Sequence, residues 1–444
     1  MTRLIFVDTG KEINQDVMSL MAFLVETYSD RQILLALEEA LYNSLTKEFK
    51  KSSYLIVPFT EKLISSGDEV VVFQNSNYDK IKRDIARGAI NDKIVKLFMP
   101  DAFFLTESNI FRNETSSYFT FSPFQDTQRF FSSLSDGSSI KRQLCIRYIN
   151  KGDLTNPLFM SVHICYSYQR YSYENQWKNI CFVIDILSNE YLIEKNRILI
   201  RYHKSCKAYI QPQMEEYKTE MCDDDNFVAH LNIPGTHFYV KVFYEHDNGL
   251  LPFVNFVLVD IRNNLSKLDS IIYQDRLELI KESKTYIMEL DRYKRLVEEV
   301  TRNQPQLLNQ ELHELTNHFI AIFSLLYMRI KGSNKGVGNE LKRKVKALAI
   351  FVKYYAPRYS PLKNIESVAK EIKTMYGFDS DCTEVISEFM HMYTSVNKVM
   401  EKNISKLERL KDMYSYEELI TSFGIPKEEF GYRHTYFSDN YPFI

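Results

Sequence analysis

The spacing of apolar residues changes along this 444-residue chain, and the change restricts the folds that it can adopt. Short strand-like and helix-like segments alternate over residues 1–100, and aromatic and β-branched runs dominate between 100 and 245. From residue 251 onward the spacing is mainly helical. Gly and Pro number only 13 and 12, which favours long regular elements over loops. We therefore predict an α+β protein with a mainly helical C-terminal half.

The pattern divides the chain into five parts. We predict an α+β unit (1–100), a β-rich domain (101–268), a coiled-coil helix (269–304), a helical hairpin (305–360) and a C-terminal helical region (361–444).

Strands and helices alternate in the predicted N-terminal unit. We expect strands at 3–8, 54–57 and 69–73, the last two joined as a hairpin, and helices at 15–28, 31–48 and 78–99. In the β-rich domain we expect strands at 118–121, 144–148, 159–166, 181–186 and 237–244, followed by an amphipathic helix at 251–268.

A seven-residue repeat follows residue 269. Its apolar positions are Leu279, Tyr286, Leu290, Tyr293, Val297 and Val300. Such a repeat is typical of a coiled coil, in which the stripe packs against a second helix. We therefore predict a homodimer.

Composition gives no support to several functional classes, although it does not exclude a nucleic-acid partner. The net charge of −2 provides no basic field for nucleic acid, so a nucleic-acid partner is not indicated. No apolar run is long enough to span a bilayer, and Asp8, Lys11 and Glu12 interrupt any signal sequence. The six cysteines form no C-x-x-C pair, which favours reduced thiols and a cytoplasmic location. We expect no membrane partner.

Candidate metal and nucleotide sites are weak. His230, His237 and His246 lie near an acidic loop, but they are spaced seven and nine positions apart, so convergence on a metal ion is not expected. No P-loop, dinucleotide-binding or Ser-His-Asp signature is present. We predict neither a metal nor a cofactor.

The sequence His313-Glu-Leu-Thr-Asn-His-Phe-Ile-Ala-Ile322 lies on a predicted helix, with His313 one residue past an apolar stripe and Asn317 one turn further on the same face. This segment resembles the phospho-acceptor box of bacterial sensor histidine kinases, although His318 stands where that family has proline. The resemblance implies a solvent-exposed acceptor at His313, with Glu314 and Asn317 in the same catalytic box.

The ATP-binding domain of such kinases is not evident after this hairpin. Residues 36–43, with Glu39 and Asn43, resemble the Asn-bearing helix of that domain, but no Gly-rich loop follows. The segment from Ile233 through the helix expected at 251–268 resembles the end of a GAF-type sensor domain in the order of its elements. Whether the chain is an enzyme stays open, because no catalytic motif is intact.

The leading hypothesis is therefore a cytosolic signalling or regulatory protein. It would resemble a histidine kinase without a working kinase domain and would act by protein–protein contact, with phosphotransfer through the hairpin as an additional activity. The first alternative is a non-enzymatic structural or assembly protein, such as a viral or phage nucleocapsid-like protein. An enzyme of unrecognised type is the second.

Overall fold

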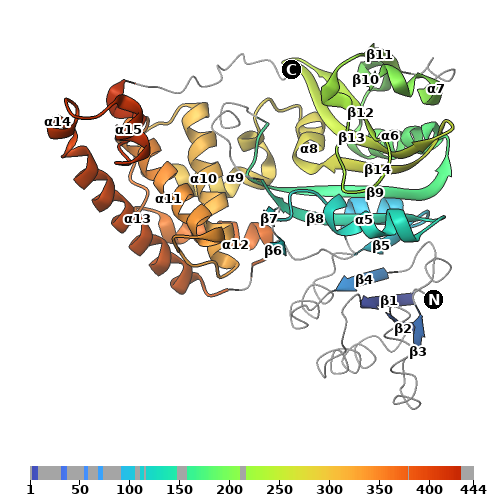
Figure 1. The fold of residues 1–444 in the computed structure, drawn as a ribbon, viewed down its shortest axis with the longest axis horizontal. Helices are drawn as coiled ribbons and strands as arrows, with labels where there is room; N and C mark the ends of the chain where they lie inside the picture. The colour runs from blue at the N-terminus through green and yellow to red at the C-terminus, as the bar shows by residue number, and fades with distance from the viewer. Residues whose placement is uncertain are drawn as a thin grey trace. The chain divides into compact units, whose positions relative to one another are not determined.

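The structure is a computed structural model that describes residues 3–8, 32–37, 55–58, 69–73, 92–105, 111–114, 117–147, 158–210, 217–378 and 380–431. The chain forms two compact units. The first comprises residues 1–112, 119–145 and 163–281 and contains the main sheet, whereas the second comprises residues 113–118, 146–162 and 282–444 and is mainly helical (Figure 1). The α+β class predicted from sequence is confirmed.

The first unit is built on one mixed sheet. Its strands lie in the order β11-β10-β12-β13-β14-β9-β8-β5-β4-β1-β2-β3. One half of the strand order contains β1 (Arg3–Asp8), β2 (Gln32–Leu37), β3 (Leu55–Pro58), β4 (Glu69–Phe73), β5 (Phe103–Leu105) and β8 (Ser138–Ile146). The other half contains β9 (Val162–Glu174), β10 (Ile198–His203), β11 (Lys218–Cys222), β12 (Phe238–His246), β13 (Gly249–Arg262) and β14 (Leu265–Tyr273).

In the order of the sheet, the six strands β3, β2, β1, β4, β5 and β8 each pair in parallel with their neighbours in this series. The three strands predicted in the N-terminal unit are confirmed as β1, β3 and β4. Their predicted hairpin pairing is wrong, because β3 pairs with β2 and β4 pairs with β1. The helix predicted at 31–48 is also wrong over residues 32–37, which form the apolar strand β2, Gln-Ile-Leu-Leu-Ala-Leu. The helix at 15–28, most of that at 78–99, and the Glu39 and Asn43 positions lie outside the described residues.

Neighbouring strands are antiparallel from β9 through β14, β13 and β12 to β10, and β11 pairs in parallel with β10 at the edge. Helices cover both faces near β9. Phe182 of α6 (Trp177–Tyr191) packs against Tyr168, as does Phe98 of α4 (Lys93–Phe98). On the opposite face, α5 (Phe124–Ser133) contacts Gln169. Strand residues 168 and 169 point to opposite faces, so this part of the unit is a three-layer arrangement.

The strand predicted at 181–186 is wrong, because that segment lies in α6. Residues Ile180, Val183, Ile184 and Leu187 are buried, which is the three-to-four spacing of a helix face. The short run Cys-Phe-Val-Ile-Asp-Ile is apolar and β-branched, and such a run fits either period.

The helix predicted at 251–268 is also wrong, because the segment is the hairpin β13–β14. Nearly every residue of β13 from Leu251 to Asp260 is buried, so the strand lacks the alternation that marks a half-exposed strand. Asn263 and Asn264 form the two-residue turn with φ of 48° and 62°, and Arg262 pairs with Leu265 across it. Two consecutive asparagines with positive φ are typical of a type I′ hairpin turn. The helix on which the GAF resemblance depended is therefore absent.

The second unit is a group of packed helices. They are α9 (Lys294–Thr301), α10 (Asn309–Tyr327), α11 (Gly336–Tyr354), α12 (Ile365–Tyr376), α13 (Cys382–Ile404), α14 (Leu407–Leu410) and α15 (Tyr416–Thr421). The predicted hairpin is confirmed as α10 and α11, and the side chain of Ser415 caps α15. Helix α10 contacts α9, α11, α12 and α13, and therefore occupies the centre of the group.

The coiled coil predicted at 269–304 is wrong. The segment consists of the end of β14, the helix α8 (Gln274–Glu282), two 3-10 turns (Ile287–Glu289 and Asp291–Tyr293) and α9. Of the predicted seam, Leu279, Leu290, Tyr293 and Val300 are fully buried in their own chain. The stripe is therefore not available to a second copy, and the reason given for a homodimer no longer applies.

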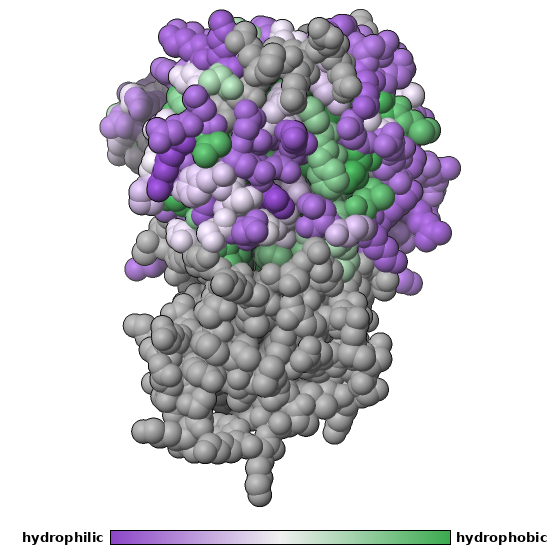
Figure 2. Space-filling view, turned by 90° about the vertical axis from the view of Figure 1, so that its right-hand side faces the viewer, coloured by the Kyte–Doolittle hydropathy of each residue, from purple (hydrophilic) through white to green (hydrophobic). Residues whose placement is uncertain are grey.

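The remaining short elements are β6 (Phe111–Glu114) and β7 (Ser117–Phe119), which pair with each other, α7 (Lys207–Ile210), and 3-10 turns at Lys195–Arg197, Lys204–Cys206, Asp225–Phe227 and Lys427–Phe430. None of the helices in the described ranges has the length and hydropathy required to cross a membrane. Figure 2 shows a face on which most coloured side chains are hydrophilic, with smaller hydrophobic areas between them.

Candidate functional site

The acceptor-box residues lie on the central helix α10. The whole run from His313 to Tyr327 is buried, around the full circumference of the helix. A helix enclosed on all sides carries no solvent-exposed face. At its start, the Glu311 carboxylate accepts a hydrogen bond from the backbone N–H of Leu308 (2.9 Å), which caps the helix.

His313 and Asn317 both contact the chain segment that precedes β9. His313 Nε2 lies 3.1 Å from the carbonyl oxygen of Phe159, and Asn317 Nδ2 donates to the same oxygen at 3.3 Å. Asn317 Oδ1 accepts a hydrogen bond from the backbone N–H of Ser161 at 2.9 Å. The prediction that these two side chains share one face of the helix is confirmed. A carbonyl oxygen only accepts, so Nε2 of His313 carries the proton.

Glu314 and His318 form a second buried pair on α10. His318 Nε2 lies 3.5 Å from Glu314 Oε1, which is close enough for an ion pair but long for a hydrogen bond. Both side chains are at most about one twentieth exposed. His318 therefore supplies a polar neighbour for Glu314 inside the helical group.

The predicted exposure of His313 is wrong: its exposed fraction is 1%. Burial lowers the pKa of His313 to about 4, and the hydrogen bond to Phe159 opposes part of that effect. A phosphoryl donor needs open access to a ring nitrogen, which this packing does not provide. The arrangement of His313 and Asn317 fixes the position of residues 159–161 and is suited to a structural role.

The sequence reasoning missed a buried polar face of the sheet in the first unit. Alternate residues of β9 from His163 to Tyr171 point to one side, and they are polar or cysteine. Asp269 of β14 pairs in register with Gln169, in the middle of this face. The alternation is visible in the sequence of β9, where His163, Cys165, Ser167 and Gln169 alternate with Ile164, Tyr166 and Tyr168, and it is the signal that could have revealed this face.

Asp269 is the centre of a hydrogen-bonded network on this face. Its Oδ1 accepts hydrogen bonds from Ser167 Oγ (2.6 Å) and Gln169 Nε2 (2.8 Å). Gln169 Nε2 also donates to Thr127 Oγ1 of α5 at 2.6 Å, and its Oε1 accepts from the Tyr171 hydroxyl at 2.8 Å. Burial raises the pKa of Asp269 to about 6, although the bonds from Ser167 and Gln169 lower it.

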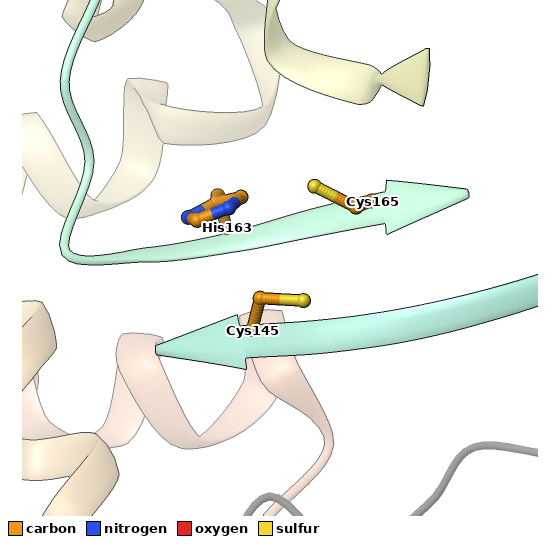
Figure 3. A group of neighbouring side chains, drawn as sticks. All are labelled: Cys145, His163 and Cys165. Atoms are coloured by element: carbon orange, nitrogen blue, oxygen red, sulfur yellow. The ribbon is translucent and has the colours of Figure 1, made fainter. Parts of the chain in front are cut away.

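At one end of the same face, Cys145, His163 and Cys165 lie together. Figure 3 shows His163 and Cys165 on β9 and Cys145 on β8, which runs in the opposite direction. Their ligand-type atoms all lie within 4.8 Å of one another, and all three residues are buried. Tyr273 and Ile271 of β14 pack against the two cysteines.

The three histidines considered from sequence do not form such a group in the described residues. His237 accepts a hydrogen bond from the backbone N–H of Asp260 at Nδ1, and its Nε2 lies 2.9 Å from the carbonyl oxygen of Ile233. His230 is exposed, and His246 lies on β12. His237 is a hydrogen-bonded structural residue.

Comparison with known proteins gives no family. No family model matches the chain, and no curated protein matches it. The solved structures that match include apo histidyl-tRNA synthetase of S. aureus, with a TM-score of 0.28 and 10% sequence identity over 48% of this chain and 69% of that chain. A similarity of this size carries no argument about site residues or activity.

Proposed function

We propose that this protein is a regulatory protein that acts by binding a protein partner and does not transfer phosphoryl groups. The observation that carries the proposal is the position of the acceptor-box residues. His313, Glu314 and Asn317 are all inside the helical group, where His313 and Asn317 hold residues 159–161 against α10. The hairpin α10–α11 is then a structural scaffold for the helical unit.

A surface suited to contact lies in the C-terminal part of the helical unit. Met413, Tyr414 and Tyr416 are 68%, 38% and 44% exposed, and they occur within four positions of the chain. The ring of Tyr414 packs on Phe423, and the ring of Tyr416 packs on Phe430. Tyr and Met side chains are enriched at protein–protein interfaces. Here the two tyrosine rings are held in place by their packing on Phe423 and Phe430.

The contact is tested by placing a photo-crosslinking amino acid at Met413 in the full chain within its host cells. A matched control places it at Lys402, which is exposed in the same unit. We expect a discrete crosslinked protein from position 413 that is absent from position 402, and we expect Tyr414→Asp and Tyr416→Asp to abolish it. A crosslink between two copies of the chain would favour the structural-assembly alternative. The same products from both positions would contradict a specific contact here.

The absence of phosphotransfer is tested with a panel of phosphorylated receiver domains. We expect wild type and His313→Gln to leave the phosphorylated receivers equally stable, because His313 is enclosed. Faster loss of phosphate with wild type than with the variant would restore the acceptor role and contradict the proposal.

A further inference from the structure

We propose that Cys145, His163 and Cys165 bind one zinc(II) ion. This site lies in the first unit, and it does not depend on the function proposed for the helical unit. The three residues supply two sulfur ligands and one nitrogen ligand, a set that zinc uses in proteins.

Strand geometry brings the three ligands together. His163 and Cys165 are separated by one residue on β9, so their side chains project from the same face of the sheet. Cys145 lies near the end of β8, the neighbouring strand in the sheet order. Each ligand is therefore held by a hydrogen-bonded strand rather than by a loop, which limits the movement needed on binding.

The separations are compatible with one metal ion. Zinc–sulfur and zinc–nitrogen bonds of about 2.3 and 2.1 Å in a tetrahedral arrangement place the ligand atoms about 3.5–3.8 Å apart. The observed atoms are at most 4.8 Å from one another. Side-chain rotations that bring the ligand atoms closer by at most about 1.3 Å close this difference. Three protein ligands leave a fourth position for water or another group.

Charge favours zinc(II) over copper(I), the other biological ion that prefers thiolates. The two thiols lose one proton each on binding, and two thiolates with a neutral imidazole and Zn²⁺ form a complex without net charge. The same ligands with Cu⁺ carry one negative charge. All three residues are buried, and Ile271 and Tyr273 pack beside the sulfurs. In such surroundings, burying an uncharged complex costs less free energy than burying a charged one.

A disulfide between Cys145 and Cys165 is the competing chemistry for two neighbouring thiols. Neither cysteine forms a disulfide in the structure. A disulfide also has no use for an imidazole, whereas His163 lies within the same 4.8 Å limit. The three-residue grouping therefore points to a metal ion.

The test uses the full chain, purified with reductant and freed of metal by a chelator. Zinc is titrated against a chromogenic competitor, proton release is measured in weak buffer, and Co²⁺ is used as a spectroscopic substitute. We expect one zinc per chain, release of about two protons because both thiols must ionise, and a thiolate-to-cobalt charge-transfer band. Copper(I) is titrated in parallel, and we expect zinc to be retained at equal free concentrations.

Three variants decide the assignment. Cys145→Ser, Cys165→Ser and His163→Gln should each weaken zinc binding by at least about 100-fold, since even outer partners of ligands are worth 10–100-fold. Cys181→Ser, at a half-buried thiol on α6, is the matched control and should bind as wild type does. Circular dichroism shows which variants fold, and one folded ligand variant is sufficient. A site that the folded variants leave intact, a missing charge-transfer band, or a Cys145–Cys165 disulfide in place of zinc would overturn the proposal.

Discussion

Asp269 couples the stability of the first unit to pH. Its folded-state pKa is about 6, above the ordinary value of 3.8, because burial penalises the carboxylate. Stability from this group is therefore fully present below pH 3.8 and is lost as the pH rises through 6. At about 1.4 kcal/mol per pKa unit, the loss is on the order of 3 kcal/mol at neutral pH.

Asp269→Asn tests this coupling, because an amide keeps an oxygen for Ser167 and Gln169 but cannot ionise. Denaturant unfolding is followed by the fluorescence of Trp177, the chain's one tryptophan, which is buried in the same unit. We expect the variant to lose about 3 kcal/mol less than wild type between pH 4 and pH 7. Asp225→Asn, at an exposed position, should follow wild type. Identical pH profiles for Asp269→Asn and wild type would show that the carboxyl is not desolvated.

At the scale of the element, the turn Asn263–Asn264 determines the β13–β14 hairpin. Both residues have positive φ, which costs most L residues about 1–2 kcal/mol. We expect Asn264→Gly to unfold at the same denaturant concentration as wild type or slightly higher. Asn264→Val should be less stable by about 1–2 kcal/mol, because a β-branched side chain resists this conformation. Equal stability of the glycine and valine variants, measured by Trp177 fluorescence, would argue against this turn.

Several elements that sequence predicted well have a side exposed to water, although the enclosed helix α10 does not. The helices α11 and α13 and the strand β12 carry a mixed pattern whose period is readable. Prediction failed for two different reasons. β13 is buried along most of its length and was taken for a helix, and α6 contains a short β-branched run that was taken for a strand. The Asn263–Asn264 pair was the local signal that could have corrected the first error.

The candidate sites were predictable only where a local sequence pattern determines the geometry. The spacing of His313 and Asn317 on one helix face followed from the 3.6-residue period. Their burial did not, because it depends on α9, α11, α12 and α13 enclosing α10, which no local pattern reports. Cys145 and His163 come together only through the pairing order of β8 and β9, so their grouping needed the topology of the sheet.

At the scale of the whole molecule, most apolar residues of the predicted coiled-coil seam lie in the interior of a single chain. Leu290 is 0% exposed. We expect Leu290→Ala to reduce stability by about 2–5 kcal/mol, the range for a leucine truncated in a core. Its molar mass by light scattering should equal that of wild type at the same concentration. A dimeric wild type that becomes monomeric in Leu290→Ala, without loss of stability, would show that the stripe is an interface.

The central claim is that His313 is an enclosed structural residue. Burial lowers its pKa to about 4, so the stability it contributes is present above the ordinary value of 6.5 and is lost as the pH falls from 6.5 to 4. His313→Gln should remove this acid sensitivity, seen as loss of helical circular dichroism. His391→Gln, at an exposed position on α13, should not.

The most direct measurement is hydrogen–deuterium exchange at the imidazole C2 position of each histidine, followed by mass spectrometry across a pH series. This exchange reports both the pKa and the solvent access of a single ring. For His313 we predict slow exchange and a midpoint near pH 4, with fast exchange at His391 in the same sample. Exchange at His313 as fast as at His391, with a midpoint near 6.5, would contradict the account and return His313 to the surface as a candidate acceptor.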